Sequence, residues 1–193
     1  MESKRIFILL GHEDKDTMCG QFAGHYEKGA LSAGHLVRRM NIGDIKFDPI
    51  LHKGYKVIQE LEPDLKKMQE DVRWANHIVI FYPMWWSSMP AILKGLFDRM
   101  WLPGFAFHFH HEGMGWDKLL KGKSGSVFVT MDSWPIVERF LLGDSTNEIG
   151  RGILGFSGIH PVHITKIGPI KTMSEEHKNR WLDTMHKWGS VTK

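Results

Sequence analysis

Three short segments of the chain hold side chains suited to binding a flat ligand with polar edges. They are residues 11–17 (GHEDKDT), 83–88 (PMWWSS) and 131–135 (MDSWP), and each directly follows an apolar run. Large aromatic side chains in such connections are unusual, because connections run over the surface and a buried aromatic needs a partner. The two tryptophans of the second segment therefore raise the question of what they pack against.

The first segment combines the Thr17 hydroxyl with the start of an expected helix. Free backbone N–H groups and the helix dipole at such a start bind phosphate. Neither G-x-G-x-x-G nor a Walker sequence follows the first apolar run, which argues against binding of an adenine dinucleotide in the Rossmann manner. The spacing alone favours the alternative of an ordinary capped loop.

In the second segment, Trp85 and Trp86 are adjacent at the end of an expected strand. A flat conjugated ring system would give them a stacking partner, and the backbone amides of residues 84–87 would be free to bond its polar edge. The alternative is that both tryptophans fill the core or a subunit interface. Two tryptophans together at the expected ligand edge of a strand favour the ligand interpretation.

The third segment offers polar groups for the edge of a ligand. Thr130, Asp132 and Ser133 carry side chains that can hydrogen-bond such an edge. The alternative is a simple turn, because Asp, Ser and Pro are common turn formers. This segment supports a ligand site only in combination with the other two.

Metal-capable side chains gather in the run FHFHHEG, where His108, His110, His111 and Glu112 are close in sequence. No distal ligand set with a recognisable zinc spacing accompanies them. We therefore expect no metal site and interpret the run as a loop that lines a pocket or a partner surface. The single cysteine, Cys19, is near a helix start, where a thiol pKa can be lowered. Without an evident base beside it, a structural role is favoured.

Alternating apolar runs and helical patterns would position these segments. Strands are expected near residues 4–10, 34–42, 76–82, 126–131 and 161–167, and helices near 17–31, 63–72, 88–101, 149–156 and 174–188. Thr17 and Ser88 are the expected caps of two helices, and Ser174 opens the last one. Residues 103–125 are expected to form a long loop.

Five strands that alternate with helices predict a parallel sheet covered on both faces. We expect a single domain over residues 1–193 with a flavodoxin-like α/β fold, whose doubly wound sheet has five parallel strands in the order 2-1-3-4-5. In such a sheet the ligand lies outside the carboxyl ends of the strands, at the switch point between the first and third strands. The three segments all follow strands at that edge.

Composition limits the other function classes. The 25 basic and 22 acidic side chains give a net charge of only +3, and the basic residues are scattered, so we expect no nucleic-acid partner. The longest apolar runs are far shorter than the ~20 residues of a spanning helix, so we expect no membrane insertion. One cysteine excludes an internal disulfide, and with no signal peptide evident a cytoplasmic location is expected.

Residues 81–107, FYPMWWSSMPAILKGLFDRMWLPGFAF, closely resemble the NAD(P)H:quinone oxidoreductases of the flavodoxin-like superfamily. That family includes the bacterial drug-activity modulators and the potassium-efflux accessory proteins. Further similar stretches are GHEDKDT at 11–17, DIKFDPI at 44–50, GMGWDKLLKGK at 113–123 and GFSGIHPV at 155–162. The resemblance thus covers nearly the whole chain.

The resemblance implies a noncovalently bound flavin, FAD or in some members FMN. It implies ping-pong hydride transfer from NADH or NADPH, as co-substrate, to the flavin and then to a quinone or similar small-molecule acceptor. It also implies a homodimer with two sites at the subunit interface. The cofactor-binding residues carried over are His12, Thr17, Met18 and Cys19 in the first segment, Pro83, Met84, Trp85, Trp86 and Ser87 along the isoalloxazine ring, and Thr130, Met131, Asp132 and Ser133 at its pyrimidine edge.

The chain departs from better-known members of that family at two places. Met18 and Cys19 replace the usual aromatic-Asn pair, and DSWPIVERF at 132–140 replaces two glycines, a Tyr and a His that are thought to stabilise the reduced flavin in mammalian-type enzymes. No catalytic side chain is therefore assigned. Two other functions stay open: a flavodoxin-like electron carrier that does not oxidise NAD(P)H, and an accessory subunit that regulates a membrane transporter through protein contact.

Overall fold

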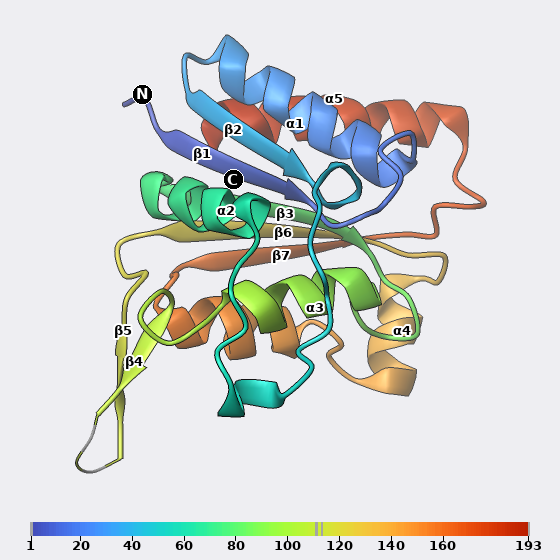
Figure 1. The fold of residues 1–193 in the computed structure, drawn as a ribbon. Coiled ribbons are helices and arrows are strands. Elements are labelled where there is room, and N and C mark those ends of the chain that lie inside the picture. Colours follow the sequence, from blue (N-terminus) through green and yellow to red (C-terminus); the bar gives the residue numbers. More distant parts are fainter. Residues whose placement is uncertain (1, 111, 113, 193) are drawn as a thin grey trace.

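A five-stranded parallel sheet forms the centre of the protein (Figure 1). The computed structural model describes residues 2–110, 112 and 114–192. The strands are β1 (Arg5–Leu10), β2 (Leu36–Asn41), β3 (His77–Pro83), β6 (Ser124–Thr130) and β7 (Val162–Ile167), in the order β2-β1-β3-β6-β7. Numbered among themselves, these five strands have the predicted order 2-1-3-4-5, and the predicted α/β fold class is confirmed.

Helices cover both faces of the sheet, as a parallel sheet requires. On one face, α1 (Met18–Ser32) and α5 (Glu175–Val191) pack against Ile6, Ile8, Val79 and Phe128. The other face is covered by α2 (Pro63–Trp74), α3 (Ala91–Met100) and the π-helix η3 (Glu148–Gly155). These helices pack against the alternate strand residues, such as Phe7, whose side chains point to that face. Two short 3-10 turns, η1 (Ile42–Asp44) and η2 (Gly54–Lys56), interrupt the segment between β2 and α2.

Two of the helix starts follow the predicted capping chemistry, and one does not. The hydroxyls of Thr17 and Ser174 accept the backbone N–H groups of the residues three positions later, each at 3.3 Å. The prediction that Ser88 caps α3 is wrong. Because Pro90 disfavours helical backbone at the residue before it, α3 begins only at Ala91. The Ser88 hydroxyl instead donates to Glu148 Oε2 at 3.1 Å.

The prediction of a long loop over residues 103–125 is also wrong. This stretch contains an antiparallel hairpin of β4 (Phe107–Phe109) and β5 (Trp116–Lys118), which projects from the body of the protein (Figure 1). Aromatic contacts attach the hairpin to η3: the rings of Trp116 and Phe156 stack with centroids 4.4 Å apart and an interplanar angle of 15°. Strands of three residues are too short to show a periodic pattern in the sequence.

A helix that the sequence did not predict, α4 (Pro135–Leu142), follows β6. Its apolar side chains point outward, and its buried residue is Glu138. The apolar residues recur at helical spacing, so the sequence does carry an amphipathic signal here, but this apolar stripe faces outward and not toward the core. Among the residues that the structure describes, no helix is both long and apolar enough to cross a membrane.

Candidate functional site

A cavity of about 210 Å³ lies where the carboxyl ends of β1, β3 and β6 meet the start of α1. It brings the three segments together, although they are far apart in the sequence. The lining residues are His12, Thr17, Met18, Cys19, Pro83, Met84, Trp85, Thr130, Met131, Asp132 and Ile170. Of the residues expected at a ligand, Trp86, Ser87 and Ser133 do not line this cavity.

The helix start at the cavity supplies hydrogen-bond donors. The first N–H groups of an α-helix have no partner within the helix, and Thr17 Oγ1 accepts only that of Gly20. His12 Nδ1 accepts the Asp14 backbone N–H at 2.9 Å, so the neutral imidazole carries its proton on Nε2. The described residues that line the cavity include neither Lys nor Arg, and Asp132 is the acidic residue among them. Recognition of an anion here therefore depends on backbone N–H groups and on His12.

A tight turn controls where the two tryptophans point. Trp85 and Ser88 exchange backbone hydrogen bonds of 2.9 and 3.0 Å, and the two residues between them, Trp86 and Ser87, have φ of 50° and 62°. Left-handed backbone costs a non-glycine residue roughly 1–2 kcal/mol. The turn leaves Trp85 against His12, with ring centroids 5.5 Å apart in an edge arrangement. Trp86 is 100% exposed, so within this chain only Trp85 has a packing partner at the cavity.

The segment after β6 is held by the segment after β7. The Met131 N–H donates to the Ile167 carbonyl at 3.0 Å, and the Ile170 N–H donates to the Met131 carbonyl at 2.9 Å. Asp132 Oδ1 accepts the Lys171 N–H at 3.2 Å. These bonds bring Ile170 into the cavity wall, a position that the sequence analysis missed. Its signal was available, because the loop after the fifth strand leaves the same edge of the sheet.

Cys19 is not an activated thiol. Burial raises its pKa to about 12, against the weaker opposing effect of a hydrogen bond with Thr130. Because the thiolate is the reactive form, such a thiol is inert at neutral pH. The favoured structural interpretation of Cys19 agrees with this environment.

The histidine run lies away from the cavity. His108 is in β4, and His110 Nε2 lies 3.3 Å from Asp117 Oδ1 of the same hairpin; His111 is outside the described residues. Across the described part of the chain, no group of three or more His, Cys, Asp or Glu side chains is arranged to hold a metal ion.

A second cavity adjoins the first. It has a volume of about 380 Å³ and shares the walls formed by Met18 and Ile170. Its other lining residues are Gln21, Lys171, Glu175, Lys178, Asn179 and Leu182, from α1, α5 and the segment between β7 and α5. Lys178 Nζ is paired with Glu175 Oε1 at 2.6 Å, so Lys171 is the lysine that makes this the more basic of the two cavities.

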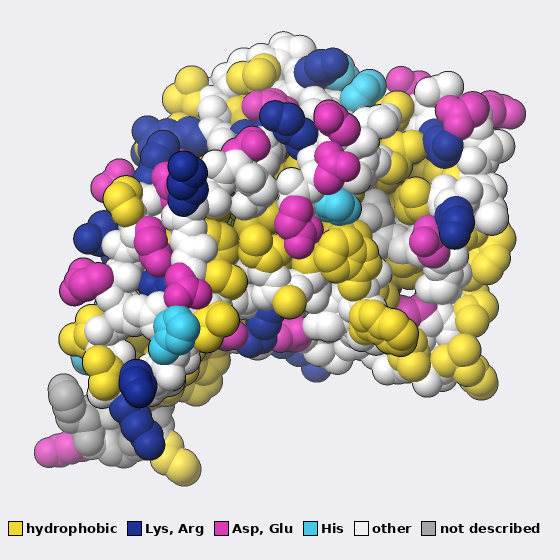
Figure 2. Space-filling view, turned by 45° about the vertical axis from the view of Figure 1, so that its right-hand side comes forward, with side chains coloured by type: hydrophobic (Ala, Val, Ile, Leu, Met, Phe, Trp, Pro, Cys, Tyr) yellow, Lys and Arg dark blue, Asp and Glu magenta, His cyan; other side chains and the backbone are white. Residues whose placement is uncertain are grey.

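Exposed apolar side chains lie next to the cavity-lining segments in the sequence. Figure 2 shows hydrophobic side chains gathered across the middle and lower right of the face that it draws, with charged groups scattered among them. Exposed apolar residues near the cavity and on α4 include Trp85, Trp86, Trp134, Ile136, Phe140 and Leu141. Large exposed apolar side chains that gather on one face of a protein are typical of a binding surface.

Together, the fold and the cavity define a doubly wound α/β protein with a candidate ligand site at the switch point between β1 and β3. A family model described as flavodoxin-like fold matches residues 4–188, and the chain belongs to this family. The sequence resemblance to NAD(P)H:quinone oxidoreductases is confirmed by the relatives that follow.

Two curated bacterial relatives are similar in sequence. An uncharacterized NAD(P)H oxidoreductase of Haemophilus influenzae is 26% identical over 185 residues, which are 91% of this chain and 89% of that protein. The uncharacterized NAD(P)H oxidoreductase YcaK of Escherichia coli is 28% identical over 123 residues, and that match spans 58% of this chain and 60% of the relative.

Two solved structures share the fold. The NAD(P)H:quinone oxidoreductase of Methanothermobacter marburgensis superposes with a TM-score of 0.82 at 19% identity, over 100% of both chains. An FMN-dependent NADH-azoreductase of Bacillus anthracis in complex with FMN gives a TM-score of 0.75 at 15% identity, over 98% of this chain and 99% of that one.

Proposed function

We propose that the protein is a flavin-dependent NAD(P)H:quinone oxidoreductase. The observation that carries the proposal is the cavity in which the amides at the start of α1, the Trp85 turn and the segment after β6 converge. The names of the relatives agree with this activity. A bound flavin would take a hydride from NAD(P)H and pass it on to the quinone. The protein positions the two rings and excludes competing reactions.

The residues at the cavity fit a flavin in type and place. The N–H groups at the start of α1, with Thr17 and His12, suit its phosphate. The turn at residues 84–88 and Trp85 suit one edge of its ring, and the backbone of residues 130–132 suits the pyrimidine edge. Donors there would stabilise the negative charge that builds up on reduction.

The space in the adjoining cavity is relevant to whether the flavin is FAD or FMN. The adjoining cavity with Lys171 and Lys178 would accommodate the adenosine half of FAD. FMN would need only the first cavity and the start of α1, and FMN is the flavin in the Bacillus anthracis structure. We propose FAD, with FMN as the alternative, NADH or NADPH as the donor and the cytoplasm as the location.

We further propose a homodimer. A cavity of about 210 Å³ is small beside the roughly 300–1,000 Å³ of typical ligand sites. Trp86, which follows the cavity-lining Trp85, is fully exposed, and Phe140 on α4 is 89% exposed. A second copy that covers these side chains would both bury them and close the site. Sedimentation would then give twice the chain mass of 22.3 kDa.

The visible absorption spectrum of the purified protein tests the class. We expect the bands of oxidised flavin, and acid release followed by chromatography identifies FAD or FMN. Steady-state turnover with NADPH and a soluble quinone then separates a reductase from an electron carrier, which would bind flavin without oxidising NADPH. A colourless protein that takes up no added flavin would refute the proposal.

Trp85→Ala tests the site itself. Trp85 forms part of the cavity wall and contacts His12, so its loss should lower kcat/KM for the quinone about ten-fold or more, because roughly 1.4 kcal/mol of ring contact is removed. Trp74→Ala is a suitable comparison, since Trp74 packs under Arg38 at the other end of the sheet. Equal loss in both variants would point to general destabilisation instead of a role at the cavity.

A further inference from the structure

Helix α4 is attached to the protein in an unusual way. Its residue Glu138 is only 3% exposed, whereas Ile136 and Leu141 on the same helix are more than 70% exposed. An ordinary surface helix buries its apolar stripe and exposes its carboxylates. The position of α4 therefore depends on the polar contacts of Glu138 more than on apolar packing against the sheet.

Lys166 in β7 is the partner of that buried carboxylate. Its Nζ lies 2.8 Å from Glu138 Oε2, and the side chains are 15% and 1% exposed. Burial opposes ionisation of Glu138, but the hydrogen bond and ion pair with Lys166 hold its pKa below the ordinary value. The other oxygen, Oε1, has no hydrogen-bond partner in the described part of the chain. Without Lys166, Glu138 would be a buried charge with no cation.

The same lysine is connected to the cavity. Its Nζ lies 3.3 Å from Ser145 Oγ, and that hydroxyl donates to the Met84 sulfur at 3.7 Å. Met84 lines the cavity, and its N–H donates to the Thr130 carbonyl. On the other side, α4 begins immediately after residues 131–134, of which Met131 and Asp132 also line the cavity. Lys166 thus connects two of the three segments that form the site.

We propose that Lys166 is a positioning residue for this site. Through its ion pair with Glu138 it holds α4 against the end of β7, and thereby fixes residues 130–134 at the cavity. This inference rests on the proposed function, because the fixed segment matters only if it faces a bound ring. It predicts that loss of the pair loosens α4 and the adjoining segment while the sheet stays intact.

Lys166→Met tests the proposal by two measurements on the full chain. Amide hydrogen exchange over residues 130–143 should become faster by on the order of ten-fold or more, with little change in β1 and β3. The KM for a soluble quinone should rise several-fold, with a smaller change in kcat, and Lys166→Arg should restore both. If Lys166→Met does not fold, Glu138→Gln removes the same charge pair with an almost identical shape.

Lys67→Met is the matched control. Lys67 also pairs with a buried carboxylate, Asp71, at 3.1 Å, but Asp71 keeps a second cation because Arg38 lies 2.8 Å away. The control should change neither measurement.

Unchanged exchange over 130–143 in Lys166→Met, or faster exchange with an unchanged KM, overturns the proposal. A wild-type protein without flavin or turnover would refute the proposed function instead, and the exchange result would still decide whether Lys166 holds the segment.

Discussion

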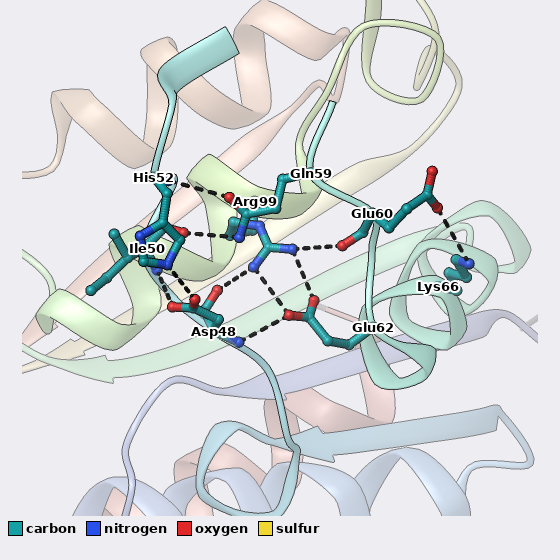
Figure 3. A network of polar contacts seen from close by, with 8 residues as sticks. All are labelled: Asp48, Ile50, His52, Gln59, Glu60, Glu62, Lys66 and Arg99. Carbon is teal, nitrogen blue, oxygen red and sulfur yellow. Dashed lines mark hydrogen bonds and ion pairs between the residues drawn. The ribbon is translucent and has the colours of Figure 1, made fainter. Parts of the chain in front are cut away.

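Arg99→Met is expected to lower the free energy of unfolding by about 3 kcal/mol, because it removes a buried guanidinium with several partners. Arg99 extends from α3 with a side chain that is 0% exposed. It donates to the carbonyl of Asp48, to the carbonyl of Glu60 at 2.9 Å and to both carboxylate oxygens of Glu62 at 3.2 and 3.0 Å (Figure 3). Methionine fills much of the volume but donates none of these bonds.

Loss of the Arg99 hydrogen bonds should affect one loop in particular. Arg99 binds residues at both ends of the loop between residues 48 and 62, as Figure 3 shows. This loop carries the exposed side chains of Tyr55 and Ile58. Burial opposes ionisation of Glu62, but hydrogen bonds from the Asp48 N–H and Arg99 hold its pKa below the ordinary value. A carboxyl group with a lowered pKa in the folded state stabilises the fold above its unfolded-state pKa, and this contribution is lost as the pH falls through the folded-state value. The difference between wild type and Arg99→Met should therefore shrink in acid.

Urea unfolding at neutral pH measures the effect, with Arg180→Met as the control. Arg180 lies 4.0 Å from Glu176 and both side chains are mostly exposed, so its loss should change stability by about 0.5 kcal/mol or less. A loss in Arg99→Met no larger than that of the control would show that the network in Figure 3 contributes little to stability.

The parts of the fold that the sequence predicted are those whose signals are local. Buried parallel strands are continuous apolar runs, and β1 and β3 can be recognised without knowing their neighbours. The same holds for the Thr17 cap. Helix α4 and the β4–β5 hairpin were not predicted. The apolar stripe of α4 does recur at helical spacing in the sequence, but its outward direction could not be read there, and the hairpin strands have only three residues each. Their positions depend on Lys166 and Phe156, which are distant in sequence.

The candidate site was predictable for a topological reason. Parallel strands end at one edge, so segments after the first, third and fourth strands of the sheet had to meet. What the sequence could not provide was the direction of individual side chains. Trp85 and Trp86 are neighbours, but the left-handed turn places one against His12 and the other in solvent. The topology places the loop that holds Ile170 at this edge, but the contact of Ile170 with the cavity comes from its backbone bond to Met131, which leaves no trace in residue type.

Helix α1 contains three glycines, and the packing of α1 on α5 explains one of them. A Cβ atom on Gly29 would lie 1.9 Å from the His186 carbonyl oxygen of α5. The contact is reciprocal, since a Cβ on Gly189 of α5 would lie 2.0 Å from the Tyr26 carbonyl oxygen. The two helices therefore approach so closely that their backbones touch, and neither position has room for a methyl group.

Gly29→Ala should consequently destabilise the protein by roughly 3 kcal/mol, although alanine is the better helix former. The added methyl meets backbone, which cannot rotate aside, so α1 and α5 must separate and expose core side chains. Gly24→Ala in the same helix is the matched control: its Cβ would meet only Arg39 Nη1, at an ordinary 3.7 Å. There the gain in helix propensity of up to about 1 kcal/mol should raise stability. Thermal unfolding of both variants tests this prediction. A lower Tm in Gly29→Ala with a higher Tm in Gly24→Ala would indicate close helix packing, whereas a higher Tm in both would show that a methyl group fits between α1 and α5.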